Sequence, residues 1–117
     1  MAVWEVEFYD LDDRTDALAE LAEEVTDRQL KRVKRQLGRL EEHGLNLDGD
    51  WFKKIEASDK GLWEFRMTAD KVEVRFIYGL IGHRFLMLRG FVHKRPNDLN
   101  RHTPIAEHRL ADWMEKA

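Results

Sequence analysis

The sequence predicts an α+β domain, in which an N-terminal strand and a helical hairpin precede a three-stranded antiparallel meander and a C-terminal helix. Residues 12–44 contain two amphipathic helical segments, and a helix start signal separates them. Three runs in which apolar and polar residues alternate follow between residues 62 and 94. A last amphipathic segment begins at a Thr-Pro pair. At 117 residues the chain is expected to form one domain, residues 1–117.

The first strand is predicted over Val3–Tyr9, where apolar and acidic side chains alternate as in a strand with one buried face. Asp12 or Asp13 is expected to cap the first helix. The apolar stripe of that helix consists of Leu18, Leu21, Ala22 and Val25.

The second helix has the clearest start in the chain. Thr26 and Gln29 have the spacing of a capping box, in which each side chain bonds the other's backbone N–H. Gly44 suits the left-handed residue that ends such a helix. The side chains expected to point inward are Leu30, Val33, Leu37 and Leu40.

The meander is predicted from strands over residues 62–68, 72–78 and 83–94. A loop at Ala69 and Asp70 would place Glu64 opposite Arg75 and Arg66 opposite Glu73. The polar face of this hairpin would then carry two compensating ion pairs.

The register of the third strand is left open by the sequence. An even loop length would place Arg84 and Lys94 on the face of Arg75. An odd loop length would place Arg89 and His93 there instead.

The last helix is expected to begin with Thr103 as its cap and Pro104 at its first position. Its predicted buried stripe consists of Ala106, Leu110, Trp113 and Met114.

Composition excludes several classes of protein. Charged residues make up 37% and apolar residues 43% of the chain, and no apolar run is long enough for a membrane helix. The N-terminus has no basic region followed by an apolar core, so no secretory signal is expected. The chain has no cysteine, which removes disulfides and thiolate metal sites and agrees with a cytoplasmic location. No metal site is expected either, because the six-residue spacing of His102 and His108 matches no helical ligand pair.

The charge of the chain is unevenly distributed. Residues 1–27 hold ten acids and one base, whereas residues 28–117 hold nineteen bases and thirteen acids. Between residues 74 and 102 there are six Lys or Arg, three His and one acid. Cations on a small sheet are what phosphate binding or phosphodiester chemistry requires, so the predicted partner of this region is a polyanion.

Four segments of the chain together resemble one family. They are WEVEFYD, LWEFR, VEVRFIY and LMLRGFVHKRPNDLNRHTP. In this order they resemble the RelE/HigB superfamily of toxins, and more specifically its phage-derived HigB-like branch. The resemblance covers nearly the whole chain and implies a RelE-like fold and a toxin of a type II toxin–antitoxin pair.

The resemblance also implies an activity and partners. Such toxins cleave mRNA, usually on the ribosome, without a metal or other cofactor, and an antitoxin that often carries a helix-turn-helix domain silences them. Metal-free cleavage uses the RNA 2′-hydroxyl as nucleophile, with side chains that transfer protons and cations that stabilise the phosphate charge.

Carried over residue by residue, the resemblance places Arg66 and Arg75 on neighbouring strands and His93 and Lys94 on the basic pair after Phe-Val. Arg75 and Lys94 are the leading phosphate contacts, and Arg66 follows because Glu73 can neutralise it. His93 and His102 are the candidate acid or base. The expected substrate-binding residues are Lys53, Lys54, Arg84, Arg89, Arg95 and Arg101.

Two alternative functions stay open on the same fold. One is a toxin of the ParE type, which acts on DNA gyrase rather than on RNA. The other is a catalytically idle, phage-derived binding module.

Overall fold

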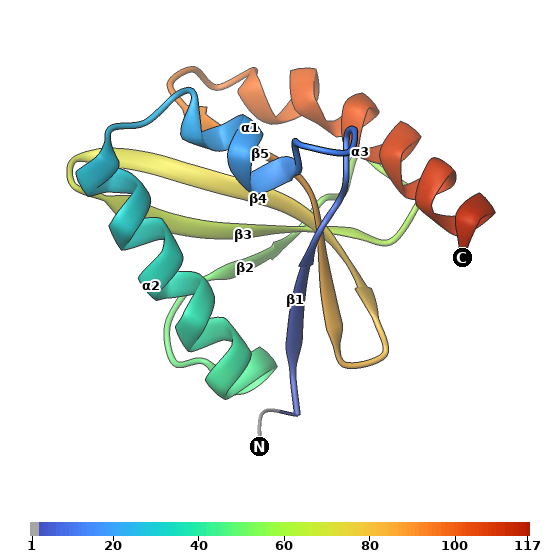
Figure 1. Cartoon of the computed structure of the whole chain (residues 1–117), viewed down its shortest axis with the longest axis horizontal. Helices are drawn as coiled ribbons and strands as arrows, with labels where there is room; N and C mark the ends of the chain where they lie inside the picture. Colours follow the sequence, from blue (N-terminus) through green and yellow to red (C-terminus); the bar gives the residue numbers. More distant parts are fainter. Residues whose placement is uncertain (1–2) are drawn as a thin grey trace.

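The computed structural model of the chain, which describes residues 3–117, is built on one five-stranded mixed sheet. The spatial order of the strands is β1-β5-β4-β3-β2; β1 pairs with β5 in parallel, and the other neighbours are antiparallel. The strands are β1 (Glu5–Phe8), β2 (Phe52–Lys54), β3 (Leu62–Ala69), β4 (Val72–Ile81) and β5 (Arg84–His93) (Figure 1).

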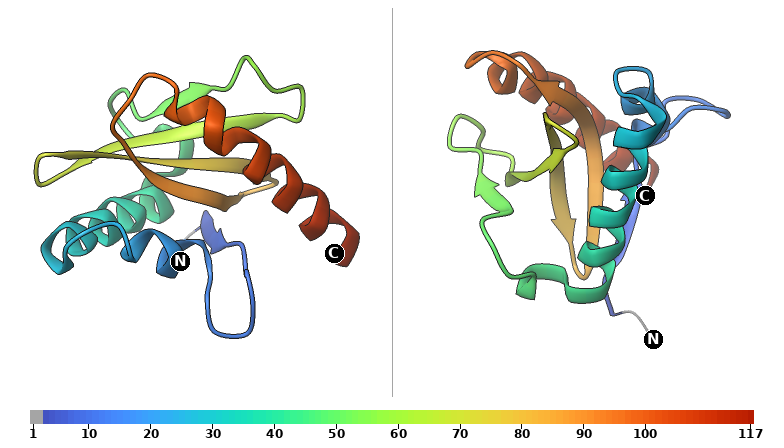
Figure 2. Two further views of the ribbon diagram at one scale, coloured as in Figure 1. Left: turned by 90° about the horizontal axis from the view of Figure 1, so that it is seen from above. Right: turned by 90° about the vertical axis from the view of Figure 1, so that its left-hand side faces the viewer.

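The helices cover both faces of the sheet. Figure 2 shows α1 and α2 on one face and α3 on the other. Among residues 3–117, no helix has an apolar stretch long enough to span a bilayer. The helices are α1 (Ala17–Ala22), α2 (Asp27–His43) and α3 (Asp98–Lys116), and the 3₁₀ turn η1 (Gly44–Asn46) follows α2.

The predicted α+β class is confirmed, but the predicted order of elements is wrong in one respect. A short strand, β2, lies between the helical hairpin and the meander and pairs with β3, so four strands rather than three run antiparallel. Three residues are too few to show a period of two, and β2 is defined by its pairing with β3 rather than by its own pattern. Lys53 and Lys54 therefore belong to an edge strand of the sheet.

The start of α2 is confirmed, and the start of α1 is not. The hydroxyl of Thr26 accepts from the backbone of Gln29, whose side chain accepts in return from the backbone of Thr26. Asp16, rather than Asp12 or Asp13, caps α1 by accepting from the backbone N–H of Ala19. Asp12 instead closes a tight turn by accepting from the backbone of residues 14 and 15.

The start of α3 also differs from the prediction. The helix begins at Asp98, so Pro104 lies inside it and Thr103 is not its cap. Asp98 stabilises the earlier start because its carboxylate accepts from two backbone N–H groups just before the helix. The Thr103 hydroxyl donates to the carbonyl of Leu99 at 2.7 Å, within the turn that precedes the proline. Of the predicted buried stripe, Met114 is 57% exposed.

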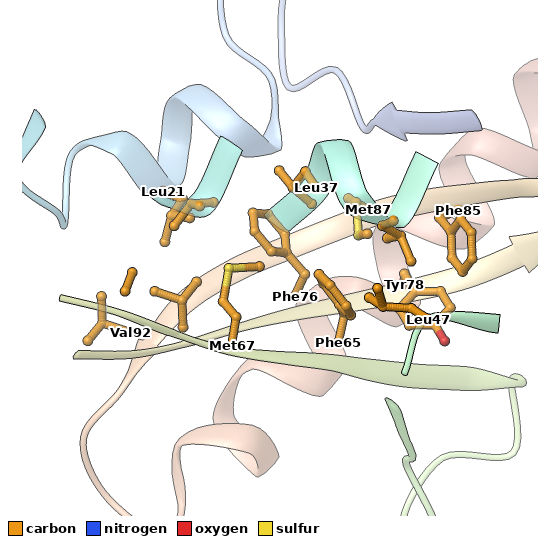
Figure 3. Packing of buried hydrophobic residues seen from close by; sticks show 14 residues of the cluster. Leu21, Leu37, Leu47, Phe65, Met67, Phe76, Tyr78, Phe85, Met87 and Val92 are labelled. Carbon is orange, nitrogen blue, oxygen red and sulfur yellow. The ribbon is translucent and has the colours of Figure 1, made fainter. Parts of the chain in front are cut away.

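Two apolar clusters hold the layers together. The larger lies between the sheet and the helices α1 and α2, and Figure 3 shows its buried side chains, with labels on residues from Leu21 to Val92. The smaller lies under α3 and includes Leu62, Ile77, Leu86 and Phe91. Trp63, near the start of β3, is 37% exposed.

The β3–β4 hairpin has a different register from the one predicted. Its two-residue turn consists of Asp70 and Lys71, both with positive φ (46° and 77°), which is typical of a type I′ turn. This turn lies one residue later than expected and places Arg66 directly opposite Arg75. Glu64 still meets Arg75, now along a diagonal, at 3.6 Å.

A bulge in β5 resolves the open register of the third strand. Tyr78 pairs with Met87 and Ile77 with Arg89, so Leu88 is an extra residue. Before the bulge, Arg84 points to the same face of the sheet as Arg75, which is the arrangement predicted for an even loop. After the bulge, Arg89 and His93 point to that face as well, which is the arrangement predicted for an odd loop. Lys94 follows the end of the strand.

Candidate functional site

The predicted site residues separate into two pockets. The first, called the arginine pocket below, has a volume of about 340 Å³ and lies over the ends of β3 and β4 beside the segment that leads into β2. It is lined by Gly49, Asp50, Trp51, Arg66, Met67, Thr68, Glu73 and Arg75.

The second, called the basic pocket below, has a volume of about 390 Å³ and lies where β5, the start of α3 and the end of α1 meet. It is lined by Glu24, Arg89, Val92, Lys94, Arg95, Asp98, Arg101 and His102. Five of these eight residues were expected from the sequence to contact substrate or act in catalysis. Arg75 and Lys94, the two leading phosphate contacts, therefore line different pockets.

Acids neutralise most of the positive charge in the arginine pocket. The guanidinium of Arg75 is buried and lies 3.6 Å from a Glu64 oxygen and 3.4 Å from a Glu73 oxygen. Arg66 is 3.9 Å from Glu64, and its side chain is 32% exposed. Arg66 is thus the more available of the two arginines, and its acidic neighbour is Glu64 rather than the predicted Glu73.

His93 lies on the same face of the sheet as Arg75 and directly opposite Glu73. Its Nδ1 is buried and, among the residues that the structure describes, has no hydrogen-bond partner. His93 is therefore adjacent to both pockets, because Glu73 lines the arginine pocket whereas the residues on either side of His93 in the chain line the basic pocket. On the edge strand β2, which pairs with β3, Lys53 is exposed and lies opposite Glu64. Lys53 lines neither pocket.

The basic pocket has a fixed backbone and free cationic ends. The carboxylate of Asp98 accepts from the backbone N–H groups of Lys94 (2.7 Å) and Arg95 (2.8 Å), and these bonds lower its pKa. Arg101 lies 3.4 Å from the same carboxylate, with its own side chain 61% exposed. Within residues 3–117, the side chains of Lys94 and Arg95 form no ion pair. Their charge is available to an anion.

The position of His102 in this pocket is well defined. Its ring stacks on Phe91 at a centroid distance of 4.2 Å, and its Nδ1 accepts from Nε of Arg89 at 3.0 Å. Burial lowers the pKa of His102, and the charges of Arg89 and Arg101 lower it further. A neutral imidazole that accepts at Nδ1 carries its proton on Nε2. His102 is therefore suited to donate a hydrogen bond rather than to act as a base through Nδ1.

Arg89 is held in turn by a carboxylate that the sequence did not single out. Glu20 on α1 lies 2.7 Å from Arg89 and accepts two bonds from Arg109 on α3, at 2.8 and 2.7 Å. Burial alone would raise the pKa of Glu20, but the bond from Arg109 and the charge of Arg89 outweigh it and hold the pKa below its usual value. Glu20 is one of ten acids in the first 27 residues, and nothing in the sequence distinguishes it.

Two predicted substrate contacts lie elsewhere. Arg84 is at the opposite end of β5, 3.4 Å from Glu5 and 3.4 Å from Glu7, where it ties β5 to β1. Lys54 pairs with Trp63 at the edge of the sheet. Neither side chain lines the arginine pocket or the basic pocket.

The lowered pKa of His102 predicts a loss of stability in mild acid. The unfolded chain takes up this proton near pH 6.5, whereas the folded chain resists it until a lower pH, so stability falls as the pH drops below about 6.5 and is unaffected above it. Denaturant unfolding at about pH 7 and pH 5.5 measures the loss. His102→Gln should lose less stability over this interval than the wild type; equal losses would contradict the assignment.

The chemistry that these residues support is anion binding and proton transfer. Within the described part of the chain, no three His, Cys, Asp or Glu side chains form a group that could hold a metal ion. The basic pocket combines three exposed cations with an imidazole N–H, and both kinds of group match phosphate oxygens, which only accept hydrogen bonds.

Comparison with known proteins identifies a family for this chain. The family model described as "Phage derived protein Gp49-like (DUF891)" matches residues 17–114. This range includes α1, all strands except β1, and nearly all of α3. No curated protein and no solved structure matched the chain.

Proposed function

The chain belongs to the Gp49-like family of phage-derived proteins, which is part of the RelE/HigB-like toxin clan, and from this premise we propose that it is a metal-free endoribonuclease toxin. A family related to toxin–antitoxin systems implies a cognate antitoxin as partner. We further propose that this antitoxin is of the helix-turn-helix type, that the substrate is mRNA on the ribosome, and that the protein acts in the cytoplasm.

One observation carries the proposal. Lys94, Arg95, Arg101 and His102 gather around a pocket in which Asp98 is occupied by backbone groups. Lys94, Arg95 and Arg101 are exposed, and of these, among the described residues, only Arg101 shares an acid, Asp98, with the backbone. Exposed cations whose charge is at most partly offset attract a polyanion strongly. The arginine pocket supports RNA binding less well, because Glu64 and Glu73 offset its two arginines.

The proposed reaction follows from these groups. The RNA 2′-oxygen attacks the adjacent phosphorus, the P–O5′ bond breaks, and a 2′,3′-cyclic phosphate and a 5′-hydroxyl result. Lys94 and Arg101 hold the non-bridging oxygens as charge builds up on them, and the Nε2–H of His102 donates to the same phosphate. Glu24, an exposed carboxylate of this pocket, accepts the 2′-hydroxyl proton, and the Lys94 ammonium protonates the leaving 5′-oxygen.

The arginine pocket is the alternative location for the same chemistry. There, Arg66 and Arg75 would contact the phosphate, His93 would act as acid or base, and Lys53 would bind the RNA strand. The two locations are separated by substitutions at exposed or partly exposed residues, Lys94 and Arg101 in one pocket and Arg66 and His93 at the other.

Lys94→Ala and Arg101→Ala are each expected to lower RNA cleavage at least about tenfold, because each removes a charge-assisted contact to the phosphate. Arg66→Ala is expected to have a smaller effect. The measurements are growth after induced expression, mapping of mRNA 5′ ends, and cleavage by the purified protein with and without ribosomes.

Lys31→Ala is the matched control, since Lys31 is an exposed cation on α2 that lines neither pocket. Wild-type cleavage by both basic-pocket variants, with loss in Arg66→Ala and His93→Ala, would move the reaction to the arginine pocket. Growth arrest without RNA cleavage would favour a toxin that acts on DNA gyrase, and harmless expression would favour an idle binding module.

A further inference from the structure

The cluster of Glu20, Arg89, Arg109 and His102 links three elements at a gap in the sheet edge. The pairing of β1 with β5 ends at Phe8 and Met87, and beyond this point α1 lies beside β5. Arg109 donates to the carbonyl of Leu88, the extra residue of the β5 bulge, at 2.8 Å. The cluster thus lies just beyond the end of the β1–β5 pairing, and two of its members, Arg89 and His102, line the basic pocket.

The three charged members are nearly withdrawn from solvent. The side chains of Glu20 and Arg89 are each 18% exposed, and that of Arg109 is 11% exposed. One carboxylate serves two guanidinium groups: Oε2 of Glu20 lies 2.7 Å from both Arg89 and Arg109, and Oε1 accepts a further bond from Arg109. Low exposure and short distances leave Arg89 little freedom to rotate.

The orientation of Arg89 determines which ring nitrogen of His102 carries the proton. With its terminal nitrogen on Glu20, Arg89 directs Nε at Nδ1 of His102, 3.0 Å away. A guanidinium can only donate hydrogen bonds, so Nδ1 must offer a lone pair and the imidazole proton must be on Nε2. Stacking on Phe91 restrains the ring itself.

We propose that Glu20 is a positioning residue, which acts through Arg89 to fix the proton of the His102 imidazole on Nε2, where it is available to a phosphate group in the basic pocket. The importance of this arrangement for catalysis rests on the proposed ribonuclease function. Glu20 itself does not line the pocket, and its effect is transmitted by one hydrogen-bonded side chain. Because Glu20 belongs to α1, the position of α1 on the sheet determines the state of a histidine on α3.

The test uses the full chain labelled with ¹⁵N-histidine, with inorganic phosphate as the probe. In the wild type at neutral pH, the ¹⁵N shifts of His102 should show the Nε2–H tautomer, and phosphate should shift the Nε2 resonance. Glu20→Gln weakens the hold on Arg89, so a mixture of tautomers and about tenfold weaker phosphate binding are expected.

Glu23→Gln is the matched control, because it removes the same charge from an exposed position at the end of the same helix. It should leave the tautomer of His102 unchanged. A wild-type His102 that is protonated or carries its proton on Nδ1 at neutral pH would overturn the proposal, even if Glu20→Gln fails to fold. An unchanged tautomer and phosphate affinity in a folded Glu20→Gln protein would overturn it as well.

These measurements do not depend on RNA cleavage. If the proposed ribonuclease function fails but the tautomer changes as expected, the positioning role of Glu20 stands and the basic pocket is a phosphate site of another kind. If cleavage occurs and the tautomer is insensitive to Glu20, the ribonuclease function stands and the positioning role does not.

Discussion

Arg75→Ala is expected to lower the free energy of unfolding by about 3 kcal/mol, because it leaves a buried carboxylate without its main partner. Glu64 has only 6% of its side chain exposed, and its nearest cation is Arg75, at 3.6 Å. Arg66 remains at 3.9 Å but is partly exposed and cannot fully replace the lost charge. Urea unfolding followed by fluorescence measures the change.

A double-mutant cycle with Glu64→Gln isolates the cause. When residue 64 is a neutral Gln, Arg75→Ala no longer leaves a buried charge without a partner. The loss in free energy of unfolding caused by Arg75→Ala should therefore be smaller by about 1.5 kcal/mol or more. Arg66→Ala, which removes a partly exposed cation from the same carboxylate, should cost less than about 1 kcal/mol. An equal cost of Arg75→Ala in both backgrounds would sink this explanation.

This result bears on how activity is tested. A loss of toxicity in Arg75→Ala can arise from unfolding. Lys94 is exposed, and Asp98, the buried partner of the exposed Arg101, keeps its two backbone hydrogen bonds when Arg101 is replaced. The basic-pocket variants are therefore the cleaner test of RNA chemistry.

Gly90→Ala is expected to lower the free energy of unfolding by about 2 to 3 kcal/mol through overpacking. Gly90 lies on β5 directly opposite Phe76, and a Cβ placed there would be 2.6 Å from Cε1 of the Phe76 ring. The ring is buried in the larger apolar cluster with Phe8 next to it, at a centroid distance of 6.3 Å, so it has little room to move. The backbone at Gly90 has no positive φ, and the cost is therefore steric.

Phe76→Leu provides the matched test. The smaller side chain removes the close contact, so Gly90→Ala should cost markedly less in a Phe76→Leu background than in the wild type. Gly38→Ala is the control: its added Cβ meets nothing within 4 Å, and alanine favours a helix, so stability should be unchanged or slightly higher. A full cost of Gly90→Ala in both backgrounds would contradict a clash with Phe76.

Local sequence patterns predicted the helices and strands that have a clear periodicity or a capping motif. The capping box of Thr26 and Gln29 and the alternation in β3 and β4 depend on residues close together in the chain. The start of α3 could not be predicted in this way, because the hydrogen bonds of Asp98 to the preceding backbone stabilise a start well before Pro104. The strand β2 was missed because it is too short to carry a pattern.

The candidate site shows the same division. The sequence shows the cluster of cations and histidines between residues 74 and 102, since their number there is a matter of composition. It could not show which of them are neutralised, because ion pairs depend on register. A one-residue shift of the β3–β4 turn changed the partner of Arg66, and one extra residue in β5 put Arg84, Arg89 and His93 on the same face as Arg75.

The α+β class, the helical hairpin, the meander and the cationic character of the C-terminal half follow from residue order and local physics, so they could be predicted. Three features emerge only from the packing of the layers: Arg75 lies between two acids, the exposed cations surround a different pocket, and Glu20 is linked to His102 through Arg89. Glu20 and Arg109 are 89 residues apart in the chain. Contacts over such separations depend on how the helices pack on the sheet, so they cannot be predicted from the pattern of neighbouring residues.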